Sequence, residues 1–492
     1  MSHNGNGNGK NVLLDETMGA KSNVFAKFMK IPRTGIIYLA TIAEQAGHNV
    51  RVVNENIRGM PVSDEQLLWA DVLGISAVTA TIEEGRRRAA RYKQLRTDAE
   101  LESKTVIGGI HASMLPDDVK DDFDQVVVGE AENVIRGILS GEITDKIVYS
   151  TRHENLDDII IPDFKLVDDW QKIGIFPVMT SRGCPYGCTF CSVTAMFGRD
   201  YRACSPERVM QELSGLEKLF NERERWPLKL LFRRGIFFAD DNFTENSKRT
   251  EEILDRMIQT GYNREMTCQV RTNIARRPDL VAKMRKAGFN TFYVGIESIN
   301  PQSLKDMKKS QTVEDIKTFV RVCHDNDIGI FGMFILGTDA DTIEGIELMN
   351  DFCREHEIDY AQFSIMTPLP GTKLYKELEA QGRLLHKEWD YYDGIHAVFQ
   401  PKNMTAVELQ QSMIKAYKEF YSLGNAARQA VKFAVNSVKA MFGKHSWPSC
   451  LQTKYQIAGT HITNEWIKSN QDYLNYLAND PKANTTFGES LT

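Results

Sequence analysis

Three cysteines stand close together in the short stretch CPYGCTFC: Cys184, Cys188 and Cys191. Thiolates at this spacing can lie on one face of a tight loop, and Gly183 and Gly187 let the backbone fold around a bound group. A [4Fe-4S] cluster held by three thiolates keeps one iron open to a small bidentate ligand. A zinc site or a set of buried unreactive thiols is the alternative. Zinc sites commonly use two cysteine pairs, and the sequence has no second C-x-x-C pair. The spacing therefore favours an iron–sulfur site with an open coordination position.

Charged residues follow three strand-like runs that come after the cysteines. Asp240 and Asp241 follow the first of these runs, and two adjacent carboxylates there need a cationic partner unless they cap the next helix. Arg271 follows the next run and could hold a carboxylate through two parallel hydrogen bonds. Glu297 follows a third run, where its carboxylate could accept hydrogen bonds from sugar hydroxyls. These four residues are therefore candidates for a ligand site at the strand ends.

Small residues follow the strand-like runs in the first third of the chain. Glycines and small hydroxyls at such positions let a bulky flat ligand lie close to the backbone, and parallel sheets bind ligands at the carboxyl ends of their strands. For an isolated Gly-Gly pair, a plain strand-to-helix turn is the simpler interpretation. The candidate binding residues in these loops are Ser76, Gly108, Gly109, His111, Gly129 and Glu130.

Short apolar runs alternate with helical patterns in this first region, which predicts a buried parallel sheet with helices on both faces. The predicted strands are Asn11–Leu14, Asn49–Val53, Val72–Val78, Thr105–Gly108 and Gln125–Val128. The predicted helices are Gly35–Ala46, Ile82–Thr97 and Ala131–Leu139. The first region is thus expected to be a doubly wound, Rossmann-like α/β domain.

Six further strand-like runs, each next to a helical pattern, predict a partial (β/α)6 barrel of TIM type in the centre of the chain. The runs are Phe176–Thr180, Gly235–Ala239, Met266–Val270, Thr291–Ile296, Gly329–Leu336 and Tyr360–Ile365. A mainly helical region follows, in which Thr405–Tyr421 is a predicted helix with Thr405 as its N-cap and Glu408 completing a capping box. Residues 425–442 predict a second amphipathic helix, with a cationic stripe beside its apolar face. Such a helix more often packs on its own domain, and binding to an anionic membrane surface is the alternative.

These patterns predict five segments: a disordered tail at 1–10, the doubly wound domain at 11–150, a linker at 151–172, the barrel domain at 173–372 and the helical region at 373–492. The last residues, after Asn479, are expected to be disordered.

Composition excludes several classes of protein. The net charge of −6 and the pI near 6.0 argue against a general nucleic-acid binder. Eight cysteines in 492 residues are too few for a disulfide scaffold and suit a reducing compartment, so a cytoplasmic protein is expected. The sequence holds no apolar run of about 18 residues, which argues against a transmembrane segment.

The spacing C-x-x-x-C-x-x-C, with an aromatic residue before the last cysteine, resembles the radical S-adenosylmethionine (SAM) superfamily. The order of the first region, with GGIHA at 108–112 and VVVGE at 126–130, resembles the cobalamin-binding domain that precedes the radical module in one branch of it. The stretches DDNF at 240–243, GIES at 295–298 and PLPGT at 368–372 are similar to those of the same enzymes.

This resemblance implies that the three cysteines hold a [4Fe-4S] cluster whose open iron binds the amino and carboxylate groups of SAM. It also implies that Asp240 or Asp241 holds the methionyl amino group and that Glu297 holds the ribose or the methionyl end. The sequence has Asp-Asp-Asn in place of the Gly-Gly-Glu form of this motif, so which aspartate makes the contact stays open. The D-x-H-x-x-G motif of other cobalamin proteins is absent, which implies a base-off corrinoid, with His111 as the one substitute ligand to consider.

The function that this resemblance implies is reductive cleavage of SAM to a 5′-deoxyadenosyl radical, followed by C-methylation of an unactivated carbon through methylcobalamin. The substrate would be a small molecule or lipid-like, and the electrons would come from an external donor of flavodoxin or ferredoxin type. One alternative keeps the cofactors but performs a non-methylating radical cyclisation or rearrangement. A different class is a non-catalytic corrinoid or iron–sulfur carrier or sensor, against which the open iron argues.

Overall fold

The computed structural model describes residues 9–19, 30–223, 235–422 except 263, five residues between 424 and 434, and 463–488 except 469. The described residues form two compact units. The first takes in the described residues up to 185 together with 192–223, and the second takes in 186–191 and the described residues from 235 onwards. Most of the predicted helix at 425–442 and most of the predicted tail at 1–10 lie outside the described residues.

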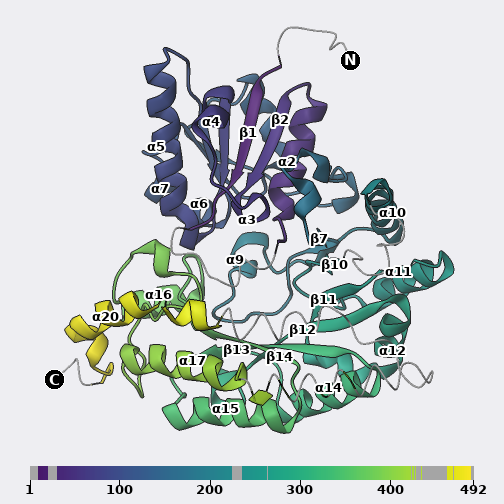
Figure 1. The fold of residues 1–492 in the computed structure, drawn as a ribbon, viewed down its shortest axis with the longest axis vertical. Coiled ribbons are helices and arrows are strands. Elements are labelled where there is room, and N and C mark those ends of the chain that lie inside the picture. Colours follow the sequence, from purple (N-terminus) through teal and green to yellow (C-terminus); the bar gives the residue numbers. More distant parts are fainter. Residues whose placement is uncertain are drawn as a thin grey trace. The chain divides into compact units, whose positions relative to one another are not determined.

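The first unit contains a six-stranded parallel sheet with the strand order β2-β1-β3-β4-β5-β6 (Figure 1). Its strands are β1 (Asn11–Glu16), β2 (Asn49–Asn54), β3 (Val72–Ser76), β4 (Thr105–Gly108), β5 (Gln125–Val128) and β6 (Ile147–Tyr149). The central strand β1 is buried along nearly its whole length, because both faces of the sheet are covered. All five predicted strands are present, whereas the three-residue β6 was not predicted.

Helices cover both faces of this sheet, as the alternating pattern predicted. Its helices are α2 (Thr34–Gln45), α3 (Glu55–Arg58), α4 (Asp64–Trp69), α5 (Ile82–Asp98), α6 (Ile110–Met114), α7 (Pro116–Val119) and α8 (Ile135–Ser140). The pair α2 and α8 pack together, and so do α4 and α5, which lie across the sheet from α2 in Figure 1. This doubly wound arrangement confirms the predicted fold class of the first region.

A buried ionic group lies between β1 and α5. Asp15 of β1 is fully buried and its carboxylate lies 3.2 Å from the guanidinium of Arg88. That single cation also contacts Glu55 at 2.6 Å and Glu84 at 2.9 Å. Burial, opposed by Arg88 and supported by the neighbouring carboxylates, raises the pKa of Asp15 to about 7.

The segment at 151–172 contains three short 3₁₀ turns, Leu156–Asp158, Phe164–Leu166 and Trp170–Lys172. It belongs to the first unit, where Asp168 accepts a hydrogen bond from Arg51 of β2 at 2.7 Å. After it come β7 (Ile175–Val178), β8 (Ser181–Arg182), α9 (Val193–Phe197), β9 (Arg202–Ala203) and α10 (Pro206–Arg223). β8 and β9 pair with each other in antiparallel fashion.

The second unit contains parallel strands in the order β14-β13-β12-β11-β10 (Figure 1). They are β10 (Gly235–Phe238), β11 (Met266–Val270), β12 (Phe289–Glu297), β13 (Gly329–Leu336) and β14 (Tyr360–Ile365). Helices α11 (Ser247–Gln259), α12 (Pro278–Ala287), α13 (Pro301–Asp306), α14 (Val313–Asp325), α15 (Ile343–Glu355) and α16 (Lys373–Ala380) follow these strands in turn. Together with β7, these strands account for all six predicted runs.

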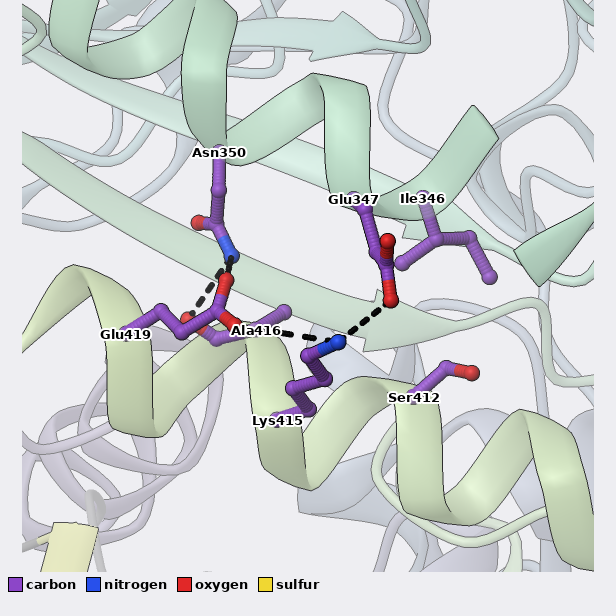
Figure 2. A pocket seen from close by; sticks show the side chains of 7 residues that line it. All are labelled: Ile346, Glu347, Asn350, Ser412, Lys415, Ala416 and Glu419. Carbon is purple, nitrogen blue, oxygen red and sulfur yellow. Dashed lines mark hydrogen bonds and ion pairs between the residues drawn. The ribbon is translucent and has the colours of Figure 1, made fainter. Parts of the chain in front are cut away.

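The last described elements are α17 (Ala406–Phe420), α20 (Gln471–Asn479) and a 3₁₀ turn at Pro481–Asn484. Thr405 and Glu408 form the predicted capping box of α17. A small pocket between α15 and α17 is crossed by polar contacts (Figure 2), where Asn350 donates to the carbonyl of Ala416 at 3.3 Å. These contacts hold α17 against α15.

The expectation of disorder after Asn479 is wrong for the described residues up to 488. The Asn484 side chain donates to the carbonyls of Leu477, in the last turn of α20, and of Asp480, just after it. Gln400 donates to the carbonyl of Lys482 at 2.8 Å. Polar side chains thus satisfy the backbone of a segment that composition alone marks as hydrophilic. Among the described helices, none combines the length and apolar character needed to cross a membrane.

Candidate functional site

The cysteine loop begins directly after β8. Gly183 has φ +88°, and an added Cβ would lie 2.3 Å from the carbonyl oxygen of Asp200, so only glycine fits there. Cys184, Cys188 and Cys191 are all half-buried, and none of the seven described cysteines forms a disulfide. The strand before the loop, β7, ends at Val178, two residues before the predicted end at Thr180, and the separate two-residue strand β8 follows it.

The second half of the loop is fixed by the backbone of the second unit. The amide of Thr189 donates to the carbonyl of Met307 at 3.2 Å, and its carbonyl accepts from the amide of Leu374 at 3.0 Å. Within the part of the chain that the structure describes, no three His, Cys, Asp or Glu side chains converge as a metal-binding group. The donor set itself, three half-buried thiols in one glycine-hinged loop, fits a [4Fe-4S] cluster with one open iron.

Asp240 and Asp241 follow β10, as predicted. Asp240 is fully buried and Asp241 is half-buried. The helix-capping alternative is wrong, because the cap of α11 is Asn246, whose side chain accepts from the amide of Arg249 at 3.1 Å. Burial raises the pKa of the Cys268 thiol on the neighbouring strand β11, and the Asp240 charge raises it further.

Arg271, at the end of β11, stacks on an aromatic ring of the cysteine loop. Its guanidinium carbon lies 3.7 Å from the ring centroid of Tyr186, and the Asn273 amide donates to the Tyr186 hydroxyl at 3.4 Å. A cation–π contact of this kind fixes the plane of the guanidinium. The sequence did not indicate this role for Tyr186, since an aromatic residue inside a cysteine motif has no partner that spacing can reveal.

Glu297 ends β12 in the left-handed region, with φ +62°, next to a register shift between Gly295 and Glu297. Its carboxylate accepts from Lys309 at 2.6 Å, and both side chains are buried. An added Cβ on Gly295 would lie 2.2 Å from Glu297 Oε1 and 2.5 Å from Lys309 Nζ, so the glycine makes room for this pair. Gln311 donates to the carbonyls of Gly295 and Ile296 at 3.1 and 2.8 Å, which supports the same turn. Lys309 and Gln311 were missed because they lie between α13 and α14 and follow no strand.

In the first unit, the glycine loops gather at the carboxyl ends of three neighbouring strands. Ser76 of β3 pairs with Gly108 of β4, and β5 lies beside β4. Gly109 has φ +100°, and an added Cβ would lie 2.4 Å from the carbonyl oxygen of Ala77, whereas one on Gly108 would meet no atom within 4 Å. The Ser113 hydroxyl donates to the Gly109 carbonyl at 2.9 Å and accepts from the Gly129 amide at 3.0 Å. The predicted small-residue edge is therefore present, with open space at Gly108 where a flat ligand could approach.

His111 lies in α6 and is fully buried. Its Nε2 is 3.0 Å from Asp118 Oδ2, and Asp118 is also contacted by Arg86 at 2.7 Å. Burial lowers the pKa of His111 despite the neighbouring Asp118 carboxylate. The ring is thus held inside the fold against the Asp118 carboxylate.

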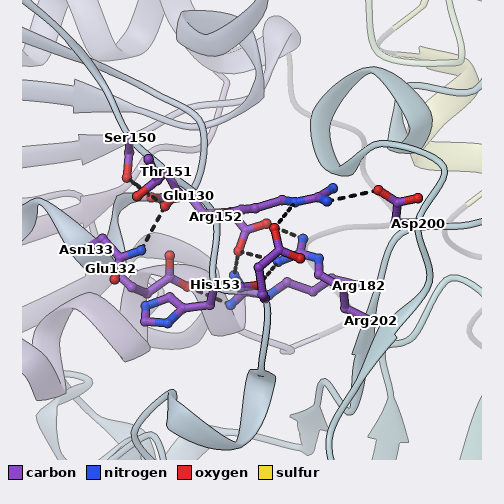
Figure 3. Close-up of polar contacts among 11 residues, drawn as sticks. Glu130, Glu132, Asn133, Ser150, Thr151, Arg152, His153, Arg182, Asp200 and Arg202 are labelled. Atoms are coloured by element: carbon purple, nitrogen blue, oxygen red, sulfur yellow. Dashed lines mark hydrogen bonds and ion pairs between the residues drawn. The ribbon is translucent and has the colours of Figure 1, made fainter.

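Glu130 takes part in a buried ionic cluster (Figure 3). Its carboxylate contacts Arg182 at 2.5 Å and also contacts Arg202, while Glu132 contacts Arg182 at 2.6 Å. Burial alone would raise the pKa of Glu130, but the hydrogen bonds and charges of Arg202 and Arg182 outweigh it and lower the pKa. The Glu130 carboxylate is thus engaged by two cations that the sequence did not indicate, and a role for Glu130 in ligand binding stays a prediction. Two carboxylates at 130 and 132 beside a buried strand were the signal that cations must be near.

Two family patterns match the chain in separate segments. The B12 binding domain matches residues 28–139, and the radical SAM superfamily matches residues 178–353. An uncharacterized methyltransferase of Pyrococcus horikoshii is 31% identical over 422 residues, which cover 79% of this chain and 88% of the relative. The chain belongs to the cobalamin-dependent radical SAM family. Its cofactors are therefore a [4Fe-4S] cluster, SAM and cobalamin, and the prediction of such an enzyme is confirmed.

Two further comparisons agree with this assignment. A hopanoid C-2 methylase of Rhodopseudomonas palustris is 29% identical over 375 residues, which cover 74% of this chain and 67% of the relative. The cobalamin-dependent radical enzyme OxsB, solved with aqua-cobalamin and SAM, has a similar fold with a TM-score of 0.66 at 14% identity. That match covers 98% of this chain and 74% of OxsB. The predicted combination of a Rossmann-like and a TIM-type fold is thereby confirmed.

Proposed function

We propose that this enzyme C-methylates an unactivated carbon of a small-molecule or lipid-like substrate. An sp³ carbon has no lone pair to attack a sulfonium, so methylation there requires a radical at that carbon. When bound, the cluster and SAM supply the radical initiator and the corrinoid supplies the methyl group. The observation that supports the proposal is one chain carrying both a three-thiol loop and a glycine-edged parallel sheet. Its relatives named as methyltransferases and methylases add weight to it.

The second unit supplies the side chains for SAM. Asp240 or Asp241 is proposed to accept from the methionyl ammonium, because both carboxylates follow β10 and neither caps α11. Arg271 lies against the cysteine loop through Tyr186, where it could hold a carboxylate. Glu297 uses Oε1 for Lys309, and its other oxygen is the candidate acceptor for a ribose hydroxyl. The ion pair with Lys309 holds this buried carboxylate in one orientation.

The first unit supplies the edge for the corrinoid. Within this unit we propose a corrinoid-binding domain at 11–150, and the radical domain is proposed at 173–372. Ser76, Gly108 and Gly109 offer backbone and small side chains at that edge, and Gly129 closes it through Ser113. His111 faces Asp118 and is not assigned as a cobalt ligand. Any contact from Glu130 is assigned to its backbone, because its carboxylate is engaged by two arginines.

The test uses protein purified without oxygen, loaded with cluster and cobalamin, and given SAM that carries a CD₃ methyl group. Hopanoid-type lipids and tetrapyrroles serve as the substrate panel, with a chemical one-electron reductant. Products are analysed by mass spectrometry, and S-adenosylhomocysteine and 5′-deoxyadenosine are quantified together.

Methyl transfer predicts a labelled product together with equal amounts of S-adenosylhomocysteine and 5′-deoxyadenosine, since each turnover consumes two SAM molecules. Substrate-dependent 5′-deoxyadenosine without S-adenosylhomocysteine or label would contradict methylation and favour the cyclising or rearranging alternative. Protein that forms neither product with any reductant would favour the carrier alternative.

A further inference from the structure

The ionic cluster of Glu130, Glu132, Arg182 and Arg202 connects two loops that the sequence sets far apart. Glu130 directly follows Gly129, in the small-residue edge of the first sheet. Arg182 lies in β8, two residues before Cys184, and Arg202 lies opposite it in β9. All four side chains are at most 5% exposed. The cluster is therefore a direct, buried connection between the end of β5 and the first half of the cysteine loop.

Each cation in this cluster is held by more than one contact. The Arg182 guanidinium bridges Glu130 and Glu132, and it also lies 5.8 Å from the ring centroid of Tyr38. Arg202 reaches Glu130 through both terminal nitrogens, one of them at 3.3 Å, and donates to the carbonyl of His153 (Figure 3). Such bidentate contacts restrict the guanidinium planes far more than a single surface ion pair would.

The cluster continues into the glycine edge through hydrogen bonds. The Ser150 hydroxyl donates to the Glu130 carbonyl, and the Gly129 amide donates to the Ser113 hydroxyl, which in turn donates to the Gly109 carbonyl. A continuous path of hydrogen bonds and covalent bonds therefore runs from Gly109 through Ser113, Gly129 and Glu130 to Arg182. The four charges sum to zero, with two carboxylates against two guanidinium groups.

We propose that this cluster is a positioning and electrostatic element, which fixes the Cys184 end of the cysteine loop to the corrinoid edge and sets the reduction potential of the [4Fe-4S] cluster. Two residues of extended chain span about 7 Å, so the Arg182 backbone lies close to any metal bound by Cys184. Interactions between charges are strong in such a buried setting, because water screens them little. The proposal depends on the iron–sulfur cluster of the family and not on methyl transfer.

Removing one of the four charges leaves the ionic cluster with a net charge. The sign of that net charge decides whether the reduction potential of the iron–sulfur cluster rises or falls. Glu130→Gln leaves one net positive charge, which favours the reduced, more negative iron–sulfur cluster and raises its potential. Arg202→Gln leaves one net negative charge and lowers the potential. For scale, two unit charges about 15 Å apart at an effective dielectric constant near 20 interact strongly enough to change an equilibrium ratio about five- to tenfold. For one electron this ratio corresponds to about 40–60 mV.

The experiment is a redox titration of the full-length, cluster-loaded protein, followed by the EPR signal of the reduced cluster. It is run without substrate, with and without hydroxocobalamin. The matched control is Asp200→Asn, which removes the same charge near the same loop from a side chain that is 71% exposed. Its partner Arg152 is also solvent-accessible, so screening should leave the potential unchanged. Glu132→Gln removes the second carboxylate of Arg182 and serves if Glu130→Gln does not fold.

We expect the reduction potential to rise in Glu130→Gln and to fall in Arg202→Gln. It should also rise in Glu132→Gln and stay unchanged in Asp200→Asn. A merely structural role would loosen the loop in both variants and would not give opposite signs. Reduced iron content in a folded Glu130→Gln, with wild-type content in Asp200→Asn, would support the positioning part. Shifts of the same sign, or iron content and potentials equal to those of the wild type, would overturn the proposal. These readouts need no methylated product, so they stay informative if the methyl-transfer function is refuted.

Discussion

The buried carboxyl group of Asp15 makes the stability of the first unit depend on pH in a direction opposite to that of most ion pairs. Burial raises its pKa from 3.8 to about 7. The charge of Arg88 opposes this rise only in part, because Arg88 is shared with Glu55 and Glu84, whose charges raise the pKa of Asp15 further. Between these two pH values the folded chain keeps a proton at Asp15 that the unfolded chain has lost. Folding stability from this group is therefore present below about pH 4 and is lost as the pH rises towards 7.

The size of the effect follows from the shift. A difference of about three pKa units, at about 1.4 kcal/mol for each, lowers the free energy of unfolding by about 4 kcal/mol. This loss is complete above pH 7. Asp15→Asn keeps the shape of the side chain and cannot ionise. The variant should match the wild type near pH 4 and exceed it by up to about 4 kcal/mol at pH 8.

The assay is urea unfolding of the cofactor-free chain at pH 5, 6, 7 and 8, read as the difference between variant and wild type. Asp117→Asn is the control, since its carboxylate is 79% exposed and should give a flat difference. A difference for Asp15→Asn that does not grow with pH would refute the reasoning. So would a variant less stable than the wild type at pH 8.

Four further predictions each concern the substitution of a single residue. Cys184→Ala should abolish the iron–sulfur signal in EPR and lower bound iron, while retention of full iron would contradict the cluster assignment. Gly109→Ala should lower the melting temperature, because its Cβ would strike the Ala77 carbonyl. Gly108→Ala, where the Cβ meets no atom, should leave the melting temperature unchanged and weaken cobalamin retention in gel filtration. Lys309→Met should cost about 3–5 kcal/mol in unfolding measurements, because Glu297 then stays buried without its cation, and a loss below 1 kcal/mol would contradict a buried pair.

Local signals in the sequence located the strands and the residues at their ends. The bounds of β4, β5, β11, β13 and β14 agree with the predicted runs, because each run is apolar and bounded by a glycine or a polar residue. The three-residue β6 escaped because so short a run carries no periodicity. The capping box of α17 was predicted because its two members lie three residues apart.

The partners of the site residues could not be predicted in the same way. Glu130 and Arg182 are 52 residues apart, and only the tertiary fold brings them together. The interpretation of Glu130 as a ligand contact therefore rested on its position at a strand end alone, because the sequence did not show that Arg182 and Arg202 lie beside it. Lys309 follows no strand and contacts Glu297 only because Gly295 leaves room. Positions were thus predictable from local patterns, whereas the charge balance of the site was not.

The most direct test of the account is the EPR spectrum of the protein loaded with cluster and cobalamin, gel-filtered, and reduced to cob(II)alamin. We predict a stoichiometric base-off signal without nitrogen superhyperfine splitting, because His111 is buried against Asp118 and no D-x-H-x-x-G motif exists. A nitrogen-split signal that disappears in His111→Leu would contradict this assignment of His111. No retained corrinoid, with SAM cleavage intact, would contradict the central claim that the enzyme combines both cofactors.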